Sequence, residues 1–401
     1  MWRRQRSWDA VDWSAVQCAY GPAVEVPGLL DRLRSRTRDI RQASYQRLSD
    51  VLNGSSEAGA VVAPFLVEIV GDPKAPDRFA AAQVLAAIAV GDQSTWLIER
   101  DDPATARREV ERRRSLTRAD LEREQDEWVV SGPTADARAA RARRVQWSDV
   151  EEDRDGQRWA VQAYDAVRAG VPAYLSALTS PDVAVRLHVA HLLAWFPEER
   201  ASIAPVLARL IVEEPDPFVA ATACVAAGLC AGGTDDTALV DAVSRRRDAV
   251  NRGEEWSAVL GLARLRSAPD RPLVEELYGC LDGARGPVPH WPLLGGDMAT
   301  VAALTIRDLP AGVAEDRVRV LVDRVTAPAD ETDRWLLLRA ALDAAFPHGP
   351  IPDGTRFADL NDDQRYAVTA LRQAGELTGG AMVSMLVGSY NLGAAGNPIL
   401  G

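Results

Sequence analysis

The histidines His188 and His191 are the first residues whose type and spacing could do chemistry. Positions three apart on a helix lie on one face, so both rings could approach one metal ion. A site would need a third ligand, and the nearest carboxylates in sequence, Asp182 and Glu198, are not in the next helical turn. The chain also has no second histidine pair. We therefore expect no metal, and we interpret the two histidines as polar surface residues.

Motifs of nucleophilic or nucleotide chemistry are absent from the sequence. There is no G-x-S-x-G, no G-x-x-x-x-G-K-[ST], and no G-x-G-x-x-G after a predicted strand. Acidic pairs such as Glu213–Glu214 and Asp235–Asp236 fall in turns between predicted helices, where we expect solvated loop residues. The sequence thus predicts no enzyme and no cofactor.

Length and composition favour a folded chain with an acidic balance. The 401 residues are 47% hydrophobic and 26% charged, with a formal net charge of −12. This length fits two or three domains or one elongated repeat array. The negative charge disfavours a general binder of nucleic-acid backbones and permits a protein partner with a basic patch.

Membrane and export signals are also missing. No run of 18 apolar residues exists, and the opening MWRRQRSWDAVDW has no apolar core of a secretory signal. The four cysteines, without a C-x-x-C pair, are typical of reduced thiols. We expect a cytoplasmic protein that does not bind membranes.

Three stretches of the chain align without a gap: 26–48 (VPGLLDRLRSRTRDIRQASYQRL), 63–85 (APFLVEIVGDPKAPDRFAAAQVL) and 171–193 (VPAYLSALTSPDVAVRLHVAHLL). A fourth, 204–227, follows with one inserted residue. In each, a proline is expected to open a first helix, a polar turn follows, and a second helix carries small residues. Neither helix can bury its apolar face alone, so neighbouring pairs must stack into an α-solenoid.

The aligned prolines, the Asp-Pro or Ser-Pro turn and the pair Val185–Arg186 resemble HEAT repeats. The resemblance is clear over 26–90 and 171–232 and weaker over 233–346, where five further helices are predicted. They span 256–265, 272–281, 298–309, 318–325 and 334–345. The opening 12–27 is similar to a group of actinobacterial HEAT-repeat proteins of unassigned chemistry.

The resemblance implies roles for particular residues. Each repeat carries an arginine (Arg41, Arg78 or Arg186) that in HEAT repeats bonds an acid or a turn carbonyl, and Asp39 and Asp182 are available for this. A contact of these arginines with a partner is the alternative. HEAT-type metal hydroxylases have His-Glu dipeptides, and this chain has none. HEAT-fold DNA glycosylases remain an alternative, because Trp195, Trp256 and Trp335 fall on predicted second helices, although the net charge opposes DNA binding.

An insert of about 91–165 interrupts the array. Residues 101–160 contain 13 basic and 15 acidic residues and few apolar residues at helical spacing. We expect one long exposed helix over about 104–128, a break at Gly132–Pro133 and a second helix from about 134. Its tryptophans, which include Trp128 and Trp147, either pin the insert onto the solenoid or anchor a partner.

The C-terminal part differs again. Residues 357–375 predict the start of a final helix pair with Asn361 as N-cap. The following apolar, glycine-rich stretch is interpreted as a cap over the last repeat, with a docking tail as the alternative.

The sequence therefore predicts an all-α, HEAT-like α-solenoid of six or seven helix pairs with an inserted charged helical hairpin. Its expected parts are an N-terminal cap with repeats 1–2 (1–90), the insert (91–165), repeats 3–7 (166–350) and a C-terminal cap (351–401). The predicted function is a non-catalytic protein-binding scaffold that uses its concave face. The candidate partner-binding residues are His188, His191, Trp195, Trp128 and Trp147. For Trp195 the alternative is a structural role, in which its ring only seals the turn before Pro197.

Overall fold

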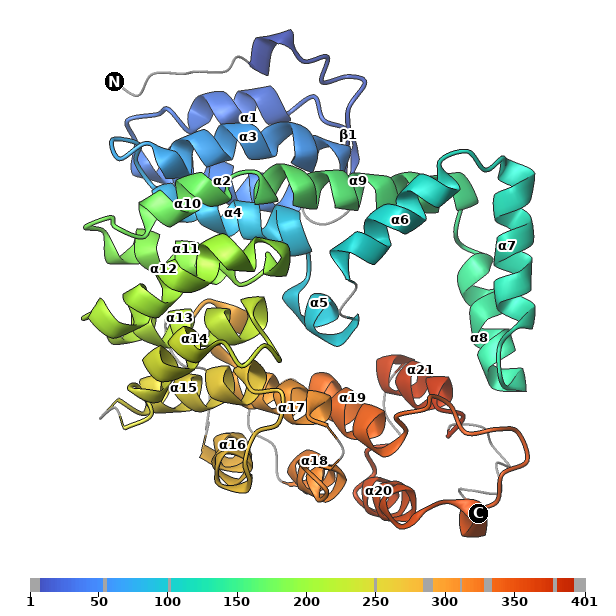
Figure 1. Ribbon diagram of the computed structural model, residues 1–401. Helices are drawn as coiled ribbons and strands as arrows, with labels where there is room; N and C mark the ends of the chain where they lie inside the picture. The colour runs from blue at the N-terminus through green and yellow to red at the C-terminus, as the bar shows by residue number, and fades with distance from the viewer. Residues whose placement is uncertain are drawn as a thin grey trace. The chain divides into compact units, whose positions relative to one another are not determined.

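The computed structural model describes residues 8–52, 56–99, 102–248, 251–283, 291–310, 312–327, 334–377 and 381–392. The predicted all-α fold is confirmed: almost all regular structure in these ranges is helical (Figure 1). The helices are α1 (Val26–Arg32), α2 (Arg38–Leu52), α3 (Glu57–Gly71), α4 (Arg78–Val90), α5 (Gln93–Glu99), α6 (Pro103–Arg113), α7 (Arg118–Val130), α8 (Ala135–Val145), α9 (Val150–Arg168), α10 (Val171–Ala177), α11 (Val183–Leu193), α12 (Arg200–Glu213), α13 (Pro217–Cys230), α14 (Thr237–Ser244), α15 (Arg252–Leu265), α16 (Arg271–Gly283), α17 (Met298–Asp308), α18 (Arg317–Thr326), α19 (Arg334–Ala345), α20 (Asp362–Gln373) and α21 (Ala381–Ser389).

A few short elements accompany the helices. Two-residue strands β1 (Gln17–Cys18) and β2 (Gly21–Pro22) pair antiparallel, with Cys18 opposite Gly21. Short 3-10 helices are η1 (Trp8–Ala10), η2 (Pro197–Glu199), η3 (Leu293–Gly296) and η4 (Phe357–Asp359).

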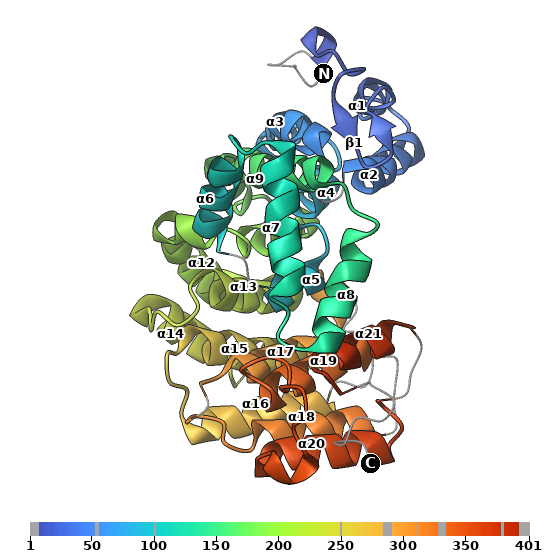
Figure 2. The ribbon, with the colours of Figure 1, turned by 90° about the vertical axis from the view of Figure 1, so that its right-hand side faces the viewer.

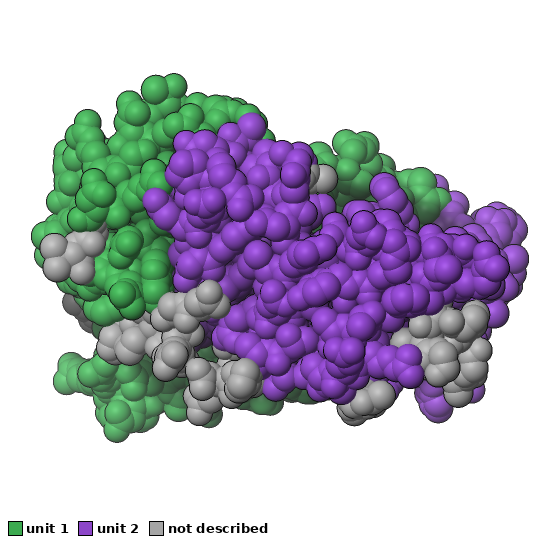
Figure 3. Space-filling view, turned by 90° about the horizontal axis from the view of Figure 1, so that it is seen from below, with its two compact units in different colours: residues 1–114, 154–267, 290–293 green, residues 115–153, 268–289, 294–401 purple. Residues whose placement is uncertain are grey.

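The chain forms two compact units, coloured separately in Figure 3. Unit 1 contains residues 1–114, 154–267 and 290–293, and unit 2 contains 115–153, 268–289 and 294–401. The insert expected from the sequence is divided between them. Helices α5, α6 and most of α9 belong to unit 1, whereas α7 and α8 belong to unit 2.

Unit 1 is a stack of helix pairs. The pairs are α1/α2, α3/α4, α10/α11, α12/α13 and α14/α15, and their second helices contact one another in that order (Figure 1). With α16/α17 and α18/α19 of unit 2, the described residues form seven pairs. The predicted α-solenoid is therefore confirmed, and the chain is a helical repeat protein.

Small residues let the second helices approach closely. Helix α13 consists mostly of Ala, Gly, Thr and Cys between its valines, and residues 219–228 are all buried. A Cβ atom added to Gly261 of α15 would lie 2.4 Å from the carbonyl oxygen of Cys224. Only glycine fits at that contact, so the sequence of α13 and α15 is set by backbone proximity.

The repeated arginines connect successive helix pairs, which confirms their structural role. Arg41 Nε bonds Asp77 at 2.5 Å, and Arg78 donates to the Ser180 hydroxyl at 3.2 Å. Arg186 bonds both carboxylate oxygens of Glu214 at 2.8 and 2.7 Å. These side-chain acceptors lie in the next pair and are not the expected Asp39 and Asp182. Each arginine also donates to a carbonyl of its own pair, as the resemblance implied; Arg78, for example, donates to the carbonyl of Val70 at 2.8 Å.

Glu214 corrects one expectation. It was predicted to be a solvated loop residue, but it is 5% exposed. A lone carboxylate would not be stable there, and Arg186 supplies the compensating charge. Asp182 serves instead as the N-cap of α11, where its carboxylate accepts the backbone N–H of Ala184.

Unit 2 contains the helix pairs α16/α17 and α18/α19, followed by α20 and α21. The helices predicted over 272–281, 298–309, 318–325 and 334–345 are confirmed here, as is the helix predicted over 256–265 in unit 1, with boundaries shifted by at most a few residues. Asn361 caps α20 as expected, because its side chain accepts the Gln364 backbone N–H and Gln364 reciprocates.

Three helix predictions were wrong. Pro64 and Pro205 do not open helices, because α3 begins at Glu57, capped by Ser56, and α12 begins at Arg200, so each proline lies inside its helix. The long helix predicted over 104–128 is two helices. The capping box between Thr117 and Asp120 starts a new helix at Arg118.

None of the described helices is long and apolar enough to span a membrane. The four cysteines are free thiols; three are buried and Cys18 is partly exposed.

Candidate functional site

The expected partner site on α11 is not an open surface. Trp195 is 1% exposed and His191 is 5% exposed, so the prediction that they are accessible was wrong. His188 is half-buried, with Nε2 3.3 Å from Gln83 Nε2 and its ring 5.9 Å from that of Phe79. Both of these contacts are to α4 of the preceding pair.

An aromatic cluster covers the end of α11. Trp96 of α5 stacks on Tyr164 of α9 at 5.6 Å and meets Trp195 edge-on at 6.4 Å. His191 packs edge-on against Trp195 at 5.5 Å. Trp96 and Tyr164 precede Trp195 in the sequence by about 100 and 30 positions. The alignment of the repeats therefore could not predict that they cover it.

Burial also fixes the charge of the two histidines. Desolvation lowers the pKa of His188 to about 4 and that of His191, which also lies near His188, to about 3. Both rings are therefore neutral at pH 7.

The carboxylates considered as third metal ligands have other roles. Asp182 caps α11, and Glu198 accepts from Tyr164 at 2.5 Å and from Arg107 at 2.8 Å. Among the residues that the structure describes, no three His, Cys, Asp or Glu side chains gather to hold a metal ion.

The two tryptophans of α7 and α8 lie in a different environment. Trp147, just after α8, is 85% exposed, and Trp128 near the end of α7 is 39% exposed. The guanidinium of Arg141 lies 4.8 Å from the Trp128 ring centroid and covers one face of it. Trp96 does hold the insert against the helix pairs, because it lies in the aromatic cluster, whereas Trp147 does not.

The α7–α8 hairpin is held mostly by polar contacts. Arg118 bonds Glu122 at 3.0 Å and Glu151 at 2.9 Å, and it also bonds Asp149. Arg141 donates to the backbone carbonyl of Trp128 at 2.6 Å. Few of its apolar side chains are buried; Leu121 is one that is fully buried. The hairpin thus keeps its shape without burying its tryptophans.

The tip of the hairpin is attached to the C-terminal part of unit 2. The backbone N–H of Ala135 donates to Asp353 at 2.8 Å, and Asn391 donates to the same carboxylate at 3.2 Å. Helix α21 packs against α8, as the views in Figures 1 and 2 also show. On α21, Leu386 is buried but Met382 and Met385 are 57% and 63% exposed.

The α7–α8 hairpin, the turn after it and α21 carry five large, exposed apolar side chains, which we together call the hairpin surface. Its members are Trp128, Val130, Trp147, Met382 and Met385. The sequence analysis missed Val130 and both methionines. Met382 and Met385 lie in the apolar stretch that the sequence assigns to a cap. Helix α21 does pack on α8 and α19, but the side chains of these two methionines remain exposed.

Comparisons with known proteins give little beyond this description. No protein-family description and no curated protein matches the sequence. Among solved structures, a crystal structure of an engineered protein is similar, with 19% identity, a TM-score of 0.32 and coverage of 92% of this chain and 98% of that chain. UNC-45 from Drosophila melanogaster is similar over 91% of this chain, with 13% identity and a TM-score of 0.37. The chain spans about half of UNC-45, since 55% of that chain is covered.

Proposed function

We propose that this chain is a non-catalytic protein-binding scaffold, and that a partner protein binds the hairpin surface. The observation that carries the proposal is Trp147, a large apolar ring that is 85% exposed just after α8, a helix rich in arginine and alanine. Tryptophan is enriched at the centres of protein interfaces, and methionine adapts to the shape of a partner. Val130, at 73% exposure, adds to the apolar area on offer.

The charges beside the two tryptophans differ in sign. Asp126 is exposed close to Trp128, whereas Arg143 and Arg144 are exposed close to Trp147. None of these three charged side chains makes a salt bridge with another described residue. The partner therefore carries a basic patch facing α7 and an acidic group facing the end of α8. The net charge of −12 speeds the approach of the basic patch.

The contacts around the buried histidines support a role without catalysis. Both rings are neutral and packed, and Asp182 and Glu198 are engaged elsewhere, so no nucleophile and base converge there. The arginines that reach the next pair support HEAT-type repeats as the finer assignment.

We also propose that the protein acts in the cytoplasm of a bacterium.

The test is affinity capture of partners from a bacterial lysate, followed by titration of each identified partner with pure variants. Trp147→Ala should weaken binding roughly 30-fold, the loss expected for an interface centre worth about 2 kcal/mol. Tyr20→Ala is the matched control, because Tyr20 is an aromatic residue of unit 1 with 73% exposure. Equal affinity of wild type, Trp147→Ala and the double variant Met382→Ala/Met385→Ala contradicts the proposal.

Charge reversals refine the result. Arg144→Glu should weaken binding if an acidic group faces Trp147, and Asp126→Lys should weaken it if a basic patch faces Trp128. Tighter binding of either variant contradicts the proposed orientation of the partner.

We also propose that the chain does not bind duplex DNA. The arginines of the repeats are engaged inside the protein; Arg41 and Arg186, for example, bond Asp77 and Glu214. Fluorescence anisotropy with labelled duplex should show no binding at physiological salt. Micromolar affinity with a steep salt dependence would restore the glycosylase alternative.

A further inference from the structure

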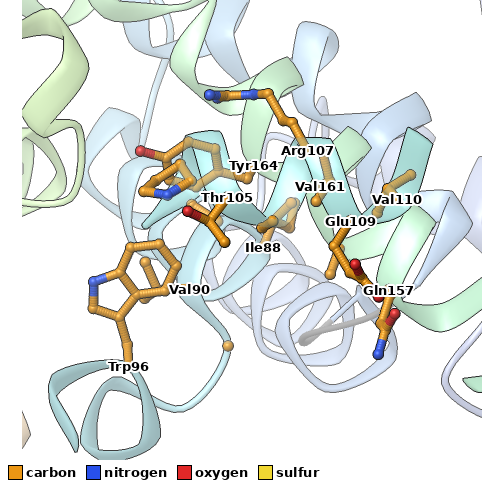
Figure 4. Close-up of a pocket in the computed structure, with 15 residues that line it drawn as sticks. Ile88, Val90, Trp96, Thr105, Arg107, Glu109, Val110, Gln157, Val161 and Tyr164 are labelled. Carbon is orange, nitrogen blue, oxygen red and sulfur yellow. The ribbon is translucent and has the colours of Figure 1, made fainter. Parts of the chain in front are cut away.

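A cavity of about 390 Å³ lies in unit 1. The end of α4, together with α5, α6 and α9, forms its walls (Figure 4). Apolar side chains dominate the lining, among them Ile88, Val90, Trp96, Val110 and Val161. Pockets for small organic molecules span roughly 300–1,000 Å³ and are lined in this way.

The charged groups at this cavity are already neutralised. The guanidinium of Arg107 forms ion pairs with the carboxylates of Asp165, at 2.5 Å, and of Glu198, at 2.8 Å. The carboxylate of Glu109 forms an ion pair with the guanidinium of Arg112, with an N–O distance of 2.7 Å. An anionic or cationic ligand would therefore find no unpaired opposite charge among the described lining residues.

The hydroxyl groups of the lining are engaged as well. The Tyr164 hydroxyl bonds the backbone carbonyl of Trp195 at 2.9 Å and the carboxylate of Glu198 at 2.5 Å. The Thr105 hydroxyl donates to Asp102 at 2.8 Å. Tyr164 thus offers its ring, and not its hydroxyl, to a ligand.

Two hydrogen-bond donors of the lining remain for a ligand: the indole N–H of Trp96, which has no partner among the described residues, and the amide of Gln157, whose side chain is exposed. The Gln157 side-chain oxygen accepts from Arg113 at 3.0 Å, which orients the amide and leaves its NH₂ without a partner among the described residues. Figure 4 shows Gln157 at the opposite end of the cavity from Trp96. The cavity thus has an aromatic end, which carries the indole N–H, and an amide donor at the other end.

We propose that this cavity binds an uncharged, mainly apolar small molecule that carries one hydrogen-bond acceptor. A flat ring lies against Trp96 and Tyr164, and an oxygen of the ligand accepts from Gln157. The inference is independent of the proposed partner at the hairpin surface, because every lining residue belongs to unit 1.

The test uses two fluorescent naphthalenes of different charge with the full chain. Prodan is neutral and carries a ketone, whereas anilinonaphthalene sulfonate is an anion. Prodan should bind saturably with one site per chain and raise the melting temperature, and the sulfonate should bind at least roughly tenfold more weakly. Absence of saturable prodan binding, or stronger binding of the anion, overturns the proposal.

Variants locate the site. Val161→Trp fills the cavity and should abolish prodan binding, while Val212→Trp, a partly exposed position of α12, should not change it. Gln157→Ala should weaken prodan roughly tenfold, since it removes the amide donor. If Val161→Trp fails to fold by circular dichroism, Trp96→Ala replaces it.

Two further outcomes contradict the proposal. Prodan binding that survives both Val161→Trp and Trp96→Ala places the site elsewhere. In the second outcome, the wild type binds no prodan while Val161→Trp loses affinity for the partner protein. That result assigns the cavity to a side chain of the partner and not to a small molecule.

Discussion

The helix pairs of unit 1 and the α7–α8 hairpin of unit 2 use arginine in opposite ways. In the pairs, arginine reaches a different helix pair and is mostly buried: the side chains of Arg186 and Glu214 are 13% and 2% exposed. In the hairpin, arginine often bonds a carboxylate three or four positions away on its own helix. Arg118 and Glu122, for example, are 52% and 55% exposed.

The difference separates the region that determines the fold from the region that presents a surface. A buried ion pair requires its partner, so it fixes the register of neighbouring helix pairs. Exposed pairs contribute little to stability, and they keep a charged helix soluble. The hairpin can therefore display Trp147 while the helix pairs enclose Trp195.

The largest effect is expected from breaking a buried pair of the repeats. Arg186→Ala leaves the Glu214 carboxylate buried without its cation and also removes a 2.8 Å bond to the carbonyl of Ser180. The free energy of unfolding should fall by about 3–5 kcal/mol, measured by urea denaturation. A loss below 1 kcal/mol would show that the repeat arginines resemble those of the hairpin.

The buried histidines give the next effect, which depends on pH. His191 has a pKa of about 3 in the folded protein, below its ordinary value of about 6.5. The unfolded chain therefore takes up the proton first. The stabilisation is complete above pH 6.5 and is lost as the pH falls toward 3.

Between pH 7.5 and pH 5, His191 should account for a loss of about 2 kcal/mol in the free energy of unfolding. His191→Phe removes this part of the pH dependence, and His348→Phe at an exposed position is the control. Parallel pH profiles for wild type and His191→Phe would show that the ring is solvated, as the sequence had suggested.

How far sequence reasoning reached also differs between the two regions. The helices predicted from 256 to 345, the Asn361 cap and the arginine role follow from local patterns, namely periodicity, capping chemistry and repeat spacing. The break before Arg118 was visible as Thr117 followed three positions later by Asp120, a capping signal that the charge pattern concealed.

The exposure of the candidate site residues could not be predicted in the same way. Trp195 is covered by Trp96 and Tyr164, which come from other helices. The cavity likewise exists only because α5, α6 and α9 meet the end of α4. Such contacts depend on the path of the chain between repeats, and no spacing within one helix encodes them.

A small effect is expected in the charged network of the hairpin. Arg118→Ala removes bonds to Glu122, Asp149 and Glu151, but all four side chains are between 35% and 55% exposed. The loss in the free energy of unfolding should be well below that of Arg186→Ala at low salt and should shrink in 0.5 M NaCl, because exposed ion pairs are screened. A loss that matches Arg186→Ala would remove the contrast between the two regions.

The smallest effect on stability is expected at Trp147, the residue on which the proposed function depends most. Its ring is 85% exposed, so truncation to alanine removes few contacts within the chain. Surface substitutions of this kind usually change the free energy of unfolding by less than about 0.5 kcal/mol. Trp195→Ala is the matched comparison, since a fully buried tryptophan costs about 3–5 kcal/mol when truncated. Urea denaturation of both variants measures the two losses in the free energy of unfolding. If Trp147→Ala were as destabilising as Trp195→Ala, the ring would be part of a packed core, and the hairpin surface could not serve as the binding surface.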